Sequence, residues 1–63
     1  MEHKFRVELL SPKGEIERVV ALSDHVLVAR GAFNAAVMQF GDRNAVRMRH
    51  GARVVEMHPP NQR

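Results

Sequence analysis

One helical pattern occupies the middle of the sequence and divides the chain into two flanking segments of strand character. Apolar residues recur at helical spacing from about Asp24 to about Phe40, and Gly41 follows as a natural end. We expect Ser23 to act as the N-cap. The stripe expected to face the core consists of Val26, Ala29, Phe33, Ala36, Val37 and Phe40. Because a single helix cannot form a core alone, the two flanking segments must pack against this stripe.

The segment before the helix predicts a hairpin. Residues Lys4–Leu9 alternate between polar and apolar, which is the period of a half-buried strand. Ser11-Pro12-Lys13-Gly14 follows as a tight turn, in which Gly14 can take the left-handed conformation. Glu15–Leu22 then reads as the returning strand. The expected cross-strand pairs are Ser11 with Glu15, Val7 with Val19, Phe5 with Ala21, and Glu8 with Arg18 as an ion pair.

The segment after the helix predicts a second hairpin. Ala45–Arg49 alternates, His50-Gly51 marks a two-residue turn, and Ala52–Met57 returns. The expected pairs are Val46 with Val55, Met48 with Arg53, Arg47 with Val54, and Arg49 with Ala52. In these registers the side chains facing the helix are Val46, Met48, Val55 and Met57, and those facing outward include Val20 and Val54.

The elements therefore predict an α+β fold in the order β-β-α-β-β. The simplest arrangement is a single four-stranded antiparallel sheet, in the order 2-1-3-4, with one helix packed on one face. We expect residues 1–58 to form a single small domain and residues 59–63 to be a frayed tail, since Pro59 and Pro60 cannot donate backbone hydrogen bonds. A helix covers only one face, so the other must be polar or meet a partner.

The charge pattern supplies the first functional hypothesis. Formal net charge is +3, with ten Lys+Arg against seven Asp+Glu. In the order 2-1-3-4, alternation places basic residues of the first and third strands side by side on the open face. The hypothesis is a nucleic-acid backbone binder that contacts phosphates through Lys4, Arg6, Arg47, Arg49 and Arg53. Against it, all three phenylalanines belong to the predicted core, which leaves none to stack on bases.

The alternative is a protein-protein interaction module, either a homodimeric adaptor or a small inhibitor of another protein. It would use the open sheet face or an outer helix stripe that includes Leu27, Gly31 and Met38. A domain of this size buries only about 60% of the surface that its unfolded chain exposes. Self-association is therefore an alternative that size alone supports, and a solvated basic surface remains the ordinary explanation of the arginines.

The sequence offers little for catalysis or for a bound cofactor. It has no cysteine, its serines Ser11 and Ser23 fit a turn and a helix cap, and its four histidines do not share a metal-ligand spacing. We therefore expect no enzyme activity, no metal and no small-molecule cofactor. Apolar runs are too short to span a membrane, and the charged N-terminus does not resemble a signal peptide, so a cytoplasmic location is expected.

Overall fold

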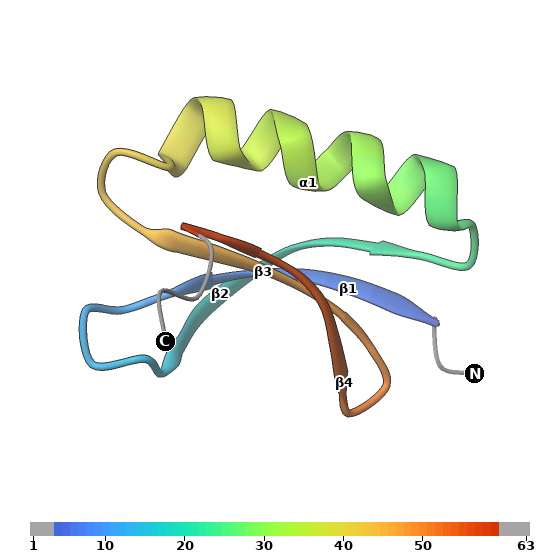
Figure 1. The fold of residues 1–63 in the computed structure, drawn as a ribbon, viewed down its shortest axis with the longest axis horizontal. Coiled ribbons are helices and arrows are strands. Elements are labelled where there is room, and N and C mark those ends of the chain that lie inside the picture. Colours follow the sequence, from blue (N-terminus) through green and yellow to red (C-terminus); the bar gives the residue numbers. More distant parts are fainter. Residues whose placement is uncertain (1–3, 60–63) are drawn as a thin grey trace.

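A computed structural model describes residues 4–59 and shows one sheet with one helix across it (Figure 1). The elements are β1 (Phe5–Leu10), β2 (Ile16–Ser23), α1 (Val26–Phe40), β3 (Ala45–His50) and β4 (Arg53–His58). The strands form one four-stranded antiparallel sheet in the order β2-β1-β3-β4. The α+β fold, the strand order and the single covering helix are thus confirmed.

The core lies between α1 and the strands β1, β2 and β3. Ala29, Phe33 and Ala36 are buried on the helix, and Val37 and Phe40 pack beside them. Their partners from the sheet are Val7, Leu9, Val46 and Met48. The predicted stripe is wrong at one end, because Val26 is the first residue of the helix and is exposed.

The first hairpin keeps its predicted turn but not its predicted register. The Ser11 amide donates to the Glu15 carbonyl at 2.8 Å, and Gly14 has a φ of +86°. Two register shifts then place one extra residue at Glu17 and another at Val20 in β2. The observed partners are Phe5 with Ser23, Val7 with Ala21, Glu8 with Val19, and Leu9 with Arg18. The predicted Glu8–Arg18 pair is therefore wrong, since the bulges move Arg18 to the helix side, over the Phe40 ring.

The second hairpin also turns one residue later than predicted. The two-residue loop is Gly51-Ala52, with Gly51 at a φ of +63°, rather than His50-Gly51. A glycine at the first loop position supplies the positive φ that a type II′ turn requires. A further register shift follows in β4, and the observed partners are His50 with Arg53, Arg49 with Val54, Met48 with Glu56, Arg47 with Met57, and Val46 with His58.

These shifts reverse the predicted direction of several side chains, among them Arg18, Val19, Val20 and Met57. Val20 packs against the core instead of facing outward. Met57 lies opposite Arg47, on the face away from the helix, instead of facing it. Val54 faces outward as predicted, since it lies opposite Arg49. A bulge adds a residue to one strand, so simple alternation places the residues that follow it on the wrong face. In β2 the second extra residue restores the alternation, and Ala21 packs against the core as predicted.

The helix begins later than its sequence signals indicate. His25 is the N-cap, without a side-chain cap hydrogen bond, whereas Ser23 is the last residue of β2 and accepts the His25 amide at 3.0 Å. The predicted end is confirmed, with Phe40 as the last helical residue and Gly41 as the C-cap. A Cβ at Gly41 would clash with the Val37 carbonyl and approach His58 Nε2 at 3.3 Å, so glycine permits this close packing.

Within residues 4–59, no helix has the length and apolar character needed to cross a membrane. The predicted tail falls mostly outside the described residues, which end at Pro59. Residues 1–3 also lie outside them.

Candidate interaction face

The sheet surface that α1 leaves uncovered is called the open face here. On β1 and β3, Arg6, Glu8, Arg47 and Arg49 alternate with core residues and therefore point to this side. Register partners bring in Leu22 and Val19 from β2, and Val54 and Met57 from β4. The open face thus has a charged centre on its two inner strands and apolar margins on its two outer strands.

Glu8 is the centre of this face, and it is fully buried, with 0% of its surface exposed. Arg47 lies directly opposite it on β3, with Nε at 2.9 Å and Nη2 at 2.8 Å from Oε1. Arg49 donates from Nε at 3.1 Å and from Nη2 at 2.7 Å to Oε2. Arg6 completes the cluster with a longer contact of 3.5 Å from Nη1 to Oε2. Both carboxylate oxygens are therefore satisfied by charged donors.

The electrostatics of Glu8 favour its ionised form. Burial raises the pKa of Glu8, because it removes the carboxylate from water. Hydrogen bonds and positive charges from Arg47 and Arg49 act in the opposite direction and outweigh burial, so the net pKa lies below its usual value. A buried carboxylate that stays ionised in this way fixes the direction of the two guanidinium groups around it.

The cluster is not neutral. Three guanidinium groups surround one carboxylate, which leaves a formal charge of +2 on the four side chains. Arg6 and Arg49 are direct cross-strand partners in the β1–β3 register. Like charges placed directly opposite destabilise a sheet, and here only Glu8 Oε2 separates them. The centre of the open face therefore carries an excess of positive charge.

Only three of the five residues of the predicted basic site lie together. Arg6, Arg47 and Arg49 converge on Glu8, as just described. Arg53 lies opposite His50, whose ring stacks on Phe5 at 4.8 Å, so Arg53 belongs to the other side of the sheet. Lys4 precedes β1, and its amide donates to Asp24 Oδ1 at 3.3 Å. Sequence reasoning had placed the arginines side by side but had assigned Glu8 to Arg18, and so it missed the residue that organises them.

The margins of the open face are apolar and exposed. On β2, the exposed side chains of this margin are Ile16, Val19 and Leu22. On β4, Val54 is exposed, and it helps to line an open hollow of about 500 Å³ together with Arg47, Met57 and Pro59. The hollow thus lies beside the arginine cluster and shares Arg47 with it.

The outer side of α1 is the second surface that the sequence singled out. Leu27 and Met38 are 79% and 88% exposed, and both point away from the sheet. Gly31 is also exposed, and among the described residues a Cβ at this position would meet nothing within 4 Å outside its own helix. The use of these residues as a dimer interface stays a prediction.

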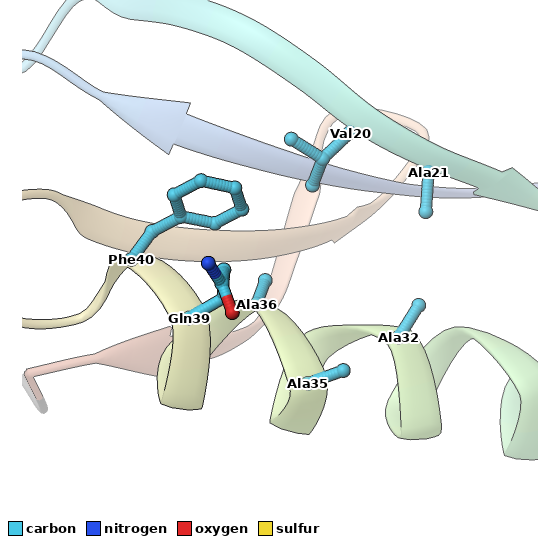
Figure 2. Close-up of a pocket in the computed structure, with 7 residues that line it drawn as sticks. All are labelled: Val20, Ala21, Ala32, Ala35, Ala36, Gln39 and Phe40. Atoms are coloured by element: carbon cyan, nitrogen blue, oxygen red, sulfur yellow. The ribbon is translucent and has the colours of Figure 1, made fainter.

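A groove between α1 and β2 is the third surface feature (Figure 2). Val20 and Ala21 on β2 face alanines of α1, with Phe40 at one end, and the groove has a volume of about 400 Å³. Its lining residues are Val20, Ala21, Ala32, Ala35, Ala36, Gln39 and Phe40. This lining provides an apolar shape without a charged or nucleophilic side chain, so the groove offers no reactive group to a ligand.

Acidic and histidine side chains do not gather into a metal site in the part of the chain that the structure describes. The Glu56 carboxylate instead binds Arg30 of α1 at 2.6 Å, which links β4 to the helix. Comparisons of the chain with protein-family models, with curated proteins and with solved structures each return no match.

Proposed function

We propose that this chain is a non-catalytic, cytoplasmic binding module that docks another protein through the open face. The observation that carries the proposal is the pairing of a rigid charged centre with apolar margins. Glu8 holds Arg47 and Arg49 in place, while Leu22, Val19 and Val54 stay exposed on either side. Arginine is enriched in protein-protein interfaces, and preorganised side chains lose less entropy on binding.

The arrangement of apolar residues distinguishes this surface from an ordinary solvated sheet face. Single exposed apolar side chains are normal on a protein surface. Here, however, exposed residues from β2 and β4 share one face and enclose the charged cluster between them. A partner that covers the open face would bury these side chains together and would also desolvate the cluster, where charged hydrogen bonds become stronger.

Nucleic-acid backbone binding is the second candidate, favoured by the net charge of +3 and by the +2 that remains on the cluster. One observation makes it the weaker one. Phe5, Phe33 and Phe40 all belong to the core cluster or pack against it, so none is available for base stacking.

Site-specific photo-crosslinking in the native cells tests the proposal. A photoreactive residue would replace Leu22 or Val54 on the open face, with Met38 on the outer helix as the matched control. We expect Leu22 and Val54 to give the same discrete protein adduct, which Met38 does not give.

Adducts formed from Met38 alone, or an absence of adducts from both open-face positions, would contradict docking through the open face. Adducts that disappear after nuclease treatment would instead favour the nucleic-acid candidate.

A further inference from the structure

We infer that the partner presents a protein segment with a carboxylate side chain, which binds Arg6 and Arg49, next to an apolar side chain that enters the hollow beside Arg47. The inference rests on the proposed function, because it names the chemistry of the partner that the open face would receive. It is built from three features of the described residues: the unbalanced charge, the unused guanidinium donors and the apolar hollow.

The unbalanced charge determines the sign of the partner. Arg6 and Arg49 lie opposite each other, and Glu8 Oε2 is 3.5 Å from the first and 2.7 Å from the second. Glu8 supplies one negative charge to three guanidinium groups, so a formal charge of +2 remains on the cluster. A second carboxylate that bridges Arg6 and Arg49 from the solvent side would reduce it to +1.

The unused donors show that the cluster has room for this carboxylate. Arg47 and Arg49 contact Glu8 through Nε and Nη2, and their Nη1 groups make no hydrogen bond to the described residues. Their side chains remain 21% and 23% exposed, and that of Arg6 is 46% exposed. Since a guanidinium presents five N–H donors, all three arginines can bind Glu8 and a second anion at once.

The hollow indicates the kind of side chain that the partner presents next to its carboxylate. Val54 and Met57 line it, and they lie opposite Arg49 and Arg47 in the β3–β4 register. The apolar hollow and the cationic pair are therefore neighbours on adjacent strands. A polypeptide supplies an anionic and an apolar side chain within a few residues of each other, whereas a nucleic-acid backbone supplies phosphates without an aliphatic group of this kind.

The same charge argues against a second copy of this chain across the open face. Two open faces in contact would bring together six arginines of the cluster and only two buried glutamates. Like-charge contact across an interface disfavours the association. The occupant that fits is thus an acidic partner protein and not the open face of another copy.

A random-peptide display selection on the purified full chain tests this partner chemistry, because the selection can be run before any partner has been identified. We expect enriched peptides to share an Asp or Glu within about two residues of a Leu, Ile or Phe. Arg6→Gln should weaken the binding of such a peptide by at least about tenfold. Arg6 is the variant of choice because its contact to Glu8 is the longest, so Glu8 keeps Arg47 and Arg49.

Two further variants complete the design. Arg53→Gln is the matched control, since it removes the same charge from the other side of the sheet and should leave the affinity unchanged. Val54→Asp should abolish binding through the hollow, whereas Met38→Asp on the outer helix should not. Circular dichroism of each variant separates loss of binding from loss of folding.

Several outcomes would overturn the inference. Enriched peptides that bind the open face without an acidic residue would refute the partner chemistry while leaving the proposed function standing. Enriched peptides that shift the NMR signals of protein amides outside the open face would count against both the partner chemistry and the proposed function. A selection that enriches nothing would do the same. The chain could instead bind a mixed-sequence DNA duplex or a single-stranded RNA in a salt-sensitive way. If Arg6→Gln weakened that binding as much as it weakens peptide binding, the cluster would be assigned to a nucleic acid.

Discussion

The two faces of the sheet each bury a large side chain at their centre, but with opposite chemistry. On the helix side, Met48 is fully buried by apolar neighbours that α1 supplies. On the open face, Glu8 is equally buried although no helix covers it, because three arginine side chains fold over its carboxylate. The long aliphatic stem of arginine can cover its neighbours while the guanidinium stays hydrated.

This difference teaches that burial has two origins in a domain of this size. The apolar face is stabilised by removal of hydrocarbon from water, which contributes roughly 25 cal/mol for each Å² buried. On the open face, charged hydrogen bonds stabilise the fold but desolvation of the ions destabilises it. The net contribution of this face to stability is therefore smaller, and it depends on every member of the cluster being present. Substitutions on the two faces should therefore differ in size and in pH dependence.

Met48→Ala should cause the largest loss. It removes a buried side chain from the centre of the core, and such changes cost about 2–5 kcal/mol. A core this small supplies a net stability of only about 3–5 kcal/mol, so much of the variant should be unfolded at room temperature. Thermal unfolding followed by circular dichroism measures this, and Met38→Ala, at a position that is 88% exposed, is the control. Similar losses in both variants would contradict the assignment of the core.

Glu8→Gln should destabilise the open face by a smaller amount, about 1.5–3 kcal/mol. The amide keeps one oxygen acceptor but directs its NH₂ group toward an arginine, and the formal charge of the cluster rises from +2 to +3. Urea unfolding at pH 7 measures the change. A stability equal to that of the wild type would show that desolvation of Glu8 cancels its hydrogen bonds.

The pH dependence of the free energy of unfolding distinguishes the contribution of the open face from that of the core, and it requires no substitution in the core. The folded-state pKa of Glu8 lies below its ordinary value of 4.5, so its ion pairs contribute fully above that pH. Their contribution should disappear as the pH falls through the folded-state pKa, because protonation then releases the arginines. The stability difference between wild type and Glu8→Gln should accordingly be constant near neutrality and should shrink in acid. A difference that is unchanged down to pH 2 would refute the ionised cluster.

Leu22→Gln should have the smallest effect on stability, within about 0.5 kcal/mol, because Leu22 is exposed at the margin of the open face. In the crosslinking and peptide experiments the same substitution should reduce binding. A large loss of stability would show that Leu22 supports the fold, and would remove it from the interaction face.

The architecture could be predicted from the sequence because its signals are local. Alternation in the strands, Pro12 and Gly14 in the first turn, and a long apolar stripe in the helix each define one element. With four strands and one helix, few connections satisfy the rules of handedness and short loops. The order of the sheet follows from those rules and is the order observed.

The registers and the charged cluster could not be predicted in the same way. Alternation assumes one residue for each position, whereas the extra residues at Glu17 and Val20 and the shift in β4 change the faces of Val20 and Met57. Glu8 faces Arg47 across a pair of strands that are far apart in the sequence. The predicted strand order places these two strands side by side, so it is compatible with this pair. The hairpin register, however, assigned Glu8 to Arg18, which is nearer in the sequence.

The bulges in β2 also bear on how the molecule avoids its own aggregation. This strand is at the edge of the sheet, is eight residues long and is rich in β-branched residues, which is the composition that recruits further strands. Its two extra residues interrupt the even spacing of outward N–H and C=O groups, so an incoming strand finds no uninterrupted ladder to extend. The irregularity that obscures the register in the sequence thus keeps an apolar edge from acting as a template for fibril growth.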